Sequence, residues 1–218
     1  MRFGAVLIAA LVAAAVATAA SPRDPKKVII PAVQAKAKAI NVQAADLPKS
    51  LGFKAKPASP DTGNPRCSYY NPDQSDLTEN GDANSPQFTL ASASFISSSA
   101  SIFKTAAQGR TAYTRVVQPK LPNCLAEIFR KGAAPNKVTI VSAKEVSFSK
   151  LAERSNAYRI VASFKSGSKR IPVYLDIVVM NRGKVDVVIF FAGIGQFFKG
   201  GFERDVAAKV AAASRMRT

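Results

Sequence analysis

The chain of 218 residues contains no histidine, and this absence limits the chemistry it can perform. Histidine is the usual general acid or base near neutral pH and the commonest metal ligand. Without it, Ser-His-Asp and Cys-His nucleophiles cannot form, so Ser97, Ser98 and Ser99 are interpreted as plain strand residues. No other catalytic motif occurs in the sequence. We therefore expect a protein that is not an enzyme and needs no cofactor.

A pair of carboxylates is the remaining enzymatic alternative, and Asp176 and Asp186 are its candidates. The strand register that the sequence predicts places Asp186 opposite Val179, on the other face of the sheet from Asp176. A hydrolase that works without histidine is therefore the least favoured function.

The acidic stretch at residues 73–82 has some features of a calcium-binding loop. In an EF-hand alignment that starts at Asp76, oxygen-bearing side chains occupy the first, third and fifth positions, and Gly81 occupies the sixth. The candidate ligands are Asp76, Thr78, Asn80 and Asp82. Gln87, however, stands at the last position, where the loop requires a bidentate glutamate. The sequence favours a polar solvent loop, with a weak calcium site as the alternative.

Cys67 and Cys124 are the two cysteines of the chain. In a secreted protein, two cysteines predict one disulfide. A redox-active or nucleophilic thiol is the alternative, but no CxxC motif and no histidine is present to activate it.

Residues 1–20 resemble a secretory signal, because Arg2 precedes an apolar run over 6–16 and small residues follow at 17–19. A membrane anchor is the alternative, but the run is shorter than the roughly 20 residues that a span requires. Residues 21–39, which are basic and contain several prolines, are predicted to form a flexible tail. Residues 40–218 then form a single domain. The mature chain is expected outside the cytoplasm, without a transmembrane segment.

The formal net charge is +17, from 31 Lys and Arg against 14 Asp and Glu. Such an excess predicts anionic surroundings or partners. Residues 130–170 are especially rich in basic residues, with 10 basic and 2 acidic residues. For a secreted chain, we expect anionic cell-wall polymers or lipid headgroups as partners. Nucleic-acid binding is not expected, because no DNA- or RNA-binding motif accompanies the charge.

Three consecutive strands are predicted over residues 156–192, because apolar residues alternate at period two on both sides of tight turns. A two-residue turn at Gly167-Ser168 sets Arg159 opposite Asp176, which predicts an ion pair between them. Further strands are predicted at 88–102 and 138–148. Helices are predicted at 104–117, 122–131 and 202–215.

One face of this meander is apolar throughout, and the other face mixes polar and apolar residues. Both faces need cover, which the predicted helices can supply. The expected fold is α+β: an antiparallel sheet with helices on both faces, an α/β/α sandwich with one disulfide. A cleft should lie where the mixed face is incompletely covered, and Arg159, Tyr174 and Asp176 would line it as the candidate ligand face.

Several short motifs are spread over residues 40–215. They are Asp46-Leu47-Pro48 with Phe53, Cys67, Gly81-Asp82-Ala83-Asn84-Ser85-Pro86 with Phe88, Pro122-Asn123-Cys124, and Ile171-Pro172-Val173-Tyr174-Leu175-Asp176. Together with a closing amphipathic helix, they resemble a group of secreted or lipid-anchored actinobacterial proteins of unknown function. The resemblance implies a fold similar to the PsbP-like sandwich and to the extracellular sensor domains of mycobacterial Ser/Thr kinases. It also implies an envelope-exposed binding or sensory module.

Two functions are therefore carried forward from the sequence. The first is a secreted, non-enzymatic binding module of the cell envelope, which associates through a basic surface with anionic components. The second is an extracellular sensor domain that binds a small ligand or a partner protein at the mixed face.

Overall fold

The computed structural model describes residues 22–58, 63–91, 94–133, 138–195, 198 and 201–215. The secretory signal expected over residues 1–20 lies outside the described residues. Within the described ranges, no helix is long and apolar enough to cross a membrane.

The described strands form a single sheet with the order β1-β3-β5-β9-β8-β7-β6, and β2 and β4 extend it beside β5. Only the pairing of β1 with β3 is parallel among these strands. The strands are β1 (Lys26–Lys27), β2 (Lys54–Lys56), β3 (Thr78–Asn84), β4 (Gln87–Leu90), β5 (Ser94–Phe103), β6 (Thr139–Val146), β7 (Arg154–Ser166), β8 (Lys169–Arg182) and β9 (Val185–Ile194). The α-helices are α2 (Pro31–Ile40), α3 (Ala106–Val116), α4 (Leu121–Gly132) and α5 (Phe202–Arg215).

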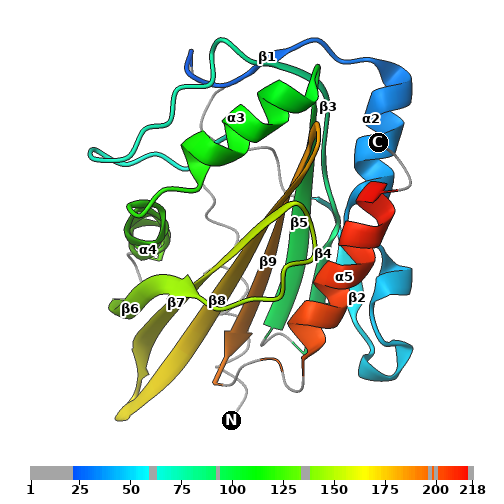
Figure 1. The fold of residues 1–218 in the computed structure, drawn as a ribbon. Helices are drawn as coiled ribbons and strands as arrows, with labels where there is room; N and C mark the ends of the chain where they lie inside the picture. The colour runs from blue at the N-terminus through cyan, green and yellow to red at the C-terminus, as the bar shows by residue number, and fades with distance from the viewer. Residues whose placement is uncertain are drawn as a thin grey trace.

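Helices cover both faces of the sheet, as Figure 1 shows. On one face, α3 and α4 pack over a core that includes Tyr158, Ile160 and Ile177. On the other face, α2 and α5 pack over a core that includes Ile189 and Phe191. The predicted α/β/α sandwich is confirmed.

The meander of β7, β8 and β9 confirms the predicted strands and the register between the first two. Arg159 lies opposite Asp176, and the turn between β7 and β8 is Gly167-Ser168. The predicted register between β8 and β9 was wrong, since Asp186 lies opposite Asn181 rather than Val179. The reason is that this turn also contains only two residues, Gly183 and Lys184.

Residues 21–39 were predicted to be a flexible tail, and this prediction was wrong for the described part of the segment. Residues 22–30, which we name the N-terminal strap, include β1, and the amides of Val28 and Ile30 donate hydrogen bonds to β3 carbonyls at 2.9 Å. Helix α2 follows, and it buries Ala37 and Ile40 completely. The sequence contains few large apolar residues here, but small residues are sufficient because α2 lies very close to β3.

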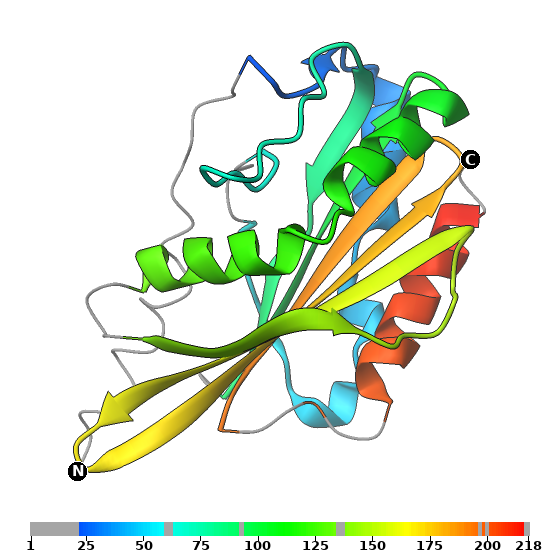
Figure 2. The ribbon, with the colours of Figure 1, turned by 60° about the vertical axis from the view of Figure 1, so that its left-hand side comes forward.

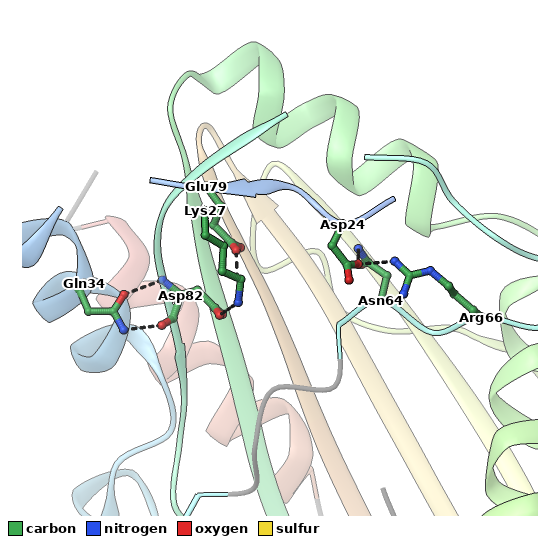
Figure 3. A network of polar contacts seen from close by, with 7 residues as sticks. All are labelled: Asp24, Lys27, Gln34, Asn64, Arg66, Glu79 and Asp82. Carbon is green, nitrogen blue, oxygen red and sulfur yellow. Dashed lines mark hydrogen bonds and ion pairs between the residues drawn. The ribbon is translucent and has the colours of Figure 1, made fainter. Parts of the chain in front are cut away.

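Ion pairs fasten the N-terminal strap to the rest of the molecule (Figure 3). The Lys27 ammonium lies 2.5 Å from Asp82 and 3.9 Å from Glu79, both on β3. Asp24 pairs with Arg66 and accepts a hydrogen bond from the Asn64 amide. The strap is therefore held at two points, Asp24 and Lys27, by side chains that are remote in sequence.

The predicted disulfide between Cys67 and Cys124 is confirmed. It ties the segment after residue 63 to the first turn of α4, where Cys124 is fully buried. A structural disulfide indicates an oxidising compartment outside the cytoplasm.

Candidate functional site

A pocket of about 280 Å³ lies between the mixed face of β7 and β8 and the first turn of α5. Its polar side is formed by Arg159, Asp176 and Glu203, and its apolar side includes Phe148 and Phe202. Residues 201–204 at the start of α5 close one side of the pocket, opposite residues of β7 and β8.

An ion pair between neighbouring strands forms the floor of the pocket. Arg159 Nε donates to Asp176 Oδ1 at 2.7 Å, and Arg159 Nη2 donates to Asp176 Oδ2 at 2.5 Å. The Asp176 side chain is 5% exposed and that of Arg159 is 32% exposed. This bidentate geometry fixes the orientation of both groups. The ion pair predicted from the strand register is thus confirmed.

Glu203 is a second carboxyl at this site, and it stands in the first turn of α5. Burial, the charge of Asp176 and a hydrogen bond with Asp176 together raise the pKa of Glu203 to about 8, although Arg159 opposes the shift. Near neutral pH the Glu203 carboxyl therefore keeps its proton and donates a hydrogen bond to Asp176. The result is a neutral acid and a carboxylate that share one proton.

Aromatic rings form the apolar wall beside these carboxyls. Phe202 stacks on Phe198 with 4.9 Å between ring centroids, and it also stacks on Phe53 at 6.0 Å. Phe198 meets Phe191 of the core edge-on at 6.1 Å. The start of α5 is thereby anchored to the core, which fixes Glu203 over Asp176.

The structure gathers only some of the residues that were predicted to line a ligand site. Arg159 and Asp176 line the pocket, whereas Tyr174 lies on the same face of β8 but outside the lining. Sequence reasoning missed Glu203. An acidic residue just after Gly200-Gly201, in the first turn of a predicted helix, was the available signal, but the sequence does not reveal what this turn faces. Ligand binding at these residues remains a prediction.

The residues proposed to bind calcium do not form a loop. Thr78, Asn80 and Asp82 lie at every second position of strand β3. The prediction of a polar solvent loop was therefore also wrong for this segment. Asp76 precedes the strand and pairs with Arg115. Gly81 has a packing role, because a Cβ there would lie 2.8 Å from the carbonyl oxygen of Val33 in α2. In the part of the chain that the structure describes, no cluster of three acidic, His or Cys side chains could hold a metal.

Asp186 lies on the other face of the sheet from Asp176, as the sequence predicted. Burial raises the pKa of Asp186 well above its ordinary value, although a hydrogen bond from Asn181, at 2.6 Å, opposes the shift. The two carboxylates proposed for a hydrolase are therefore separated by the sheet.

Comparisons with known proteins give little further information. The sequence matches no protein-family model and no curated protein. Among solved structures, the extracellular domain of PknH from Mycobacterium tuberculosis is similar, with 10% sequence identity and a TM-score of 0.32. The match covers 60% of this chain and 62% of that one. This neighbour is of the mycobacterial kinase class that the sequence motifs resemble, but the likeness is too remote to support a functional argument.

Proposed function

We propose that this chain is a non-enzymatic, extracytoplasmic binding module, which associates through a basic surface with anionic components of the cell envelope. The anionic groups would belong to cell-wall polymers or to lipid headgroups. The observation that carries the proposal is the charge at the tip of the β7–β8 hairpin. We name residues 165–170 the basic tip.

The basic tip presents Lys165, Lys169 and Arg170 to solvent, and all three residues are exposed. Figures 1 and 2 show the hairpin projecting beyond the helices. Lys165 lies directly opposite Arg170 across the two strands. Like charges in this position destabilise a hairpin. An external anion would relieve their repulsion. The facing cations are therefore better explained by the binding of an anion than by a contribution to the stability of the hairpin.

In the described part of the chain, carboxylates do not neutralise the basic tip. The sequence contains no Asp or Glu between Arg154 and Arg170. Among the described residues, no carboxylate forms an ion pair with Lys165, Lys169 or Arg170. Each cation near an anionic membrane contributes about 1 kcal/mol, so the tip could supply about 3 kcal/mol.

The last turn of α4 extends this basic surface. It carries Arg130 and Lys131, and its Phe129 packs in the same apolar cluster as Phe164 at the base of the tip. Lys131 is already paired with Glu127, so Arg130 is the more available cation of the two.

Co-sedimentation with anionic vesicles, neutral vesicles and purified anionic cell-wall polymer tests the proposal. The triple variant Lys165→Gln, Lys169→Gln, Arg170→Gln should lose about 100-fold in affinity for the anionic targets. The matched control is Lys36→Gln, Lys54→Gln, Lys56→Gln, which removes three exposed lysines from α2 and β2. Comparing vesicles with polymer identifies the source of the anions.

Two outcomes would contradict the proposal. One is an equal loss of binding in both triple variants, which would indicate a response to net charge alone. The other is binding that does not weaken between low and high salt, since exposed charge contacts must be screened.

A second candidate function is a sensor domain that binds a small ligand in the pocket beside α5. The carboxyl pair of the buried Asp176 and the partly buried Glu203, together with its aromatic wall, favours it. Both oxygens of Asp176 are held by Arg159, so this carboxylate is poorly placed to act as a base or nucleophile. That constraint supports binding rather than catalysis at the pocket.

A further inference from the structure

The charges that line the pocket beside α5 do not balance unless a proton is present. Two carboxyls, Asp176 and Glu203, face one guanidinium, that of Arg159. Arg204 also reaches the lining, but its side chain is 58% exposed and is bonded to Asp205 at 3.1 Å. Asp176, Glu203 and Arg159 together are therefore neutral when the two carboxyls share one proton. Without that proton, these three groups carry one net negative charge.

We infer that this pocket binds a small organic cation, an ammonium or guanidinium group on an apolar body, whose charge replaces the proton shared by Asp176 and Glu203. The inference rests on the second candidate function, ligand binding at the pocket. It is independent of the basic tip.

The shape and lining of the pocket fit such a ligand. Its volume of about 280 Å³ is near the lower limit for small-molecule sites, which begin at roughly 300 Å³. Phe148 and Phe202 line the pocket and can contact the apolar body, and an aromatic ring also attracts a cation. The amino end of α5 stabilises an ionised Glu203 once the ligand has displaced its proton.

The surroundings of Glu203 determine how binding depends on pH. The charged groups that face it are Arg159 from β7, Asp176 from β8, and Arg204 from α5 itself. Burial and the neighbouring Asp176 raise the pKa of Glu203 to about 8. Below that pH, a cation must displace one proton, so its affinity should rise about tenfold per pH unit up to pH 8 and then level off.

Three probes of similar size and different charge test the inference: n-butylammonium, n-butanol and n-butyrate. Binding is followed by NMR chemical shifts of residues around the pocket in the full chain. We expect n-butylammonium to shift these signals, to bind more tightly at pH 8 than at pH 6, and to release close to one proton per molecule at pH 6.

Glu203→Gln is the decisive variant, because glutamine mimics the protonated acid but cannot lose a proton. Its affinity for n-butylammonium should be lower by tenfold or more, and binding should release no proton. Glu153→Gln is the matched control, since it removes one exposed carboxylate elsewhere on the surface and should bind as the wild type does.

A stability measurement checks that Glu203→Gln remains folded and that the shared proton exists. A carboxyl with a raised pKa holds more protons in the folded than in the unfolded state between about pH 4.5 and pH 8, so stability falls as the pH rises through that window. The urea midpoint of the wild type should therefore fall between pH 5 and pH 8.5, and that of Glu203→Gln should fall less.

The outcomes separate the inference from the function on which it rests. Binding of n-butyrate or n-butanol in preference to n-butylammonium would overturn the cation inference but retain a ligand pocket. No response at the pocket to any of the three probes would overturn both. Cation binding that is unchanged in Glu203→Gln would place the site elsewhere and also overturn the inference.

Discussion

The N-terminal strap and the basic tip are both rich in positive charge, but the structure uses their charges differently. In the strap, Lys27 lies within 2.5 Å of Asp82 and 3.9 Å of Glu79. In the tip, Lys165 faces Arg170, another cation. The strap is packed along the edge of β3, whereas the tip projects beyond the helices (Figures 2 and 3).

Basic composition therefore does not by itself indicate a binding surface. The partners of Lys27 are more than fifty residues away in the sequence, so no local window contains the neutralising charges. At the tip, the paired strands bring cations to face cations, and no acid lies nearby in the chain. The exposed cations of the tip therefore face one another and not an acid.

Removing the disulfide should change stability most, and it should affect the strap more than the tip. The double variant Cys67→Ser, Cys124→Ser should reduce the free energy of unfolding by about 4 kcal/mol, because it releases a loop of 57 residues. Asp24 is bonded to Arg66 and Asn64, which lie close to Cys67 in the sequence. The amides of the strap should therefore lose their protection from hydrogen exchange first. Urea unfolding and hydrogen exchange measure the two effects. Equal losses of protection at the strap and the tip would contradict this view.

A methyl group at Gly81 should weaken the strap region next in order. The added Cβ would lie 2.8 Å from the Val33 carbonyl oxygen, so α2 would be pushed away from β3. Such overpacking should cost about 2–3 kcal/mol in urea unfolding. Gly167→Ala at the tip is the control. A Cβ there meets open space, and its positive φ of 62° should cost only about 1 kcal/mol. A larger loss at Gly167 than at Gly81 would refute the comparison.

Local patterns predicted the elements whose partners are close in sequence. Alternation in β7 and β8, together with a two-residue turn, was sufficient to place Arg159 beside Asp176. The strap, α2 and β3 were missed for the opposite reason. Asn80, Gly81 and Asp82 have the composition of a turn, but the strap on one side and β5 on the other hold them in a sheet.

The candidate site was predicted by half. The strand register brought Arg159 and Asp176 together, but Glu203 is 27 residues beyond Asp176, on an element whose position over the sheet depends on the stacking of Phe198 and Phe202. The raised pKa of Glu203 depends on burial and on Asp176, and neither can be read from neighbouring residues. Tertiary packing, rather than local spacing, creates this carboxyl pair.

A single-cation comparison sharpens the difference between the two regions. Lys27→Gln should reduce the free energy of unfolding by about 1 kcal/mol, because Glu79 and Asp82 lose a positive neighbour in a partly buried setting. Lys169→Gln should change it by less than about 0.5 kcal/mol, since the residue is exposed at the tip. Urea unfolding of both variants at the same pH makes the measurement. Similar losses in the two variants would argue against the distinction.

The smallest effect should be a gain in stability at the tip. Lys165→Glu would place an acid opposite Arg170 in the β7–β8 register, so an attractive pair would replace a repulsive one. We expect the free energy of unfolding to rise by about 0.5 kcal/mol at low salt, and Lys165→Gln to give roughly half of that gain. Salt should reduce both differences.

The same Lys165→Glu variant should bind anionic vesicles less well than the wild type does, since it removes one cation and adds one anion at the projecting end of the hairpin. A loss of stability would show that Lys165 contributes to the fold, and unchanged vesicle binding would contradict its role toward an external anion. A more stable variant with weaker binding would instead mean that the facing cations destabilise the hairpin and are useful only toward an external anion. Stability and binding would then oppose each other at the tip, whereas in the strap the charges serve stability.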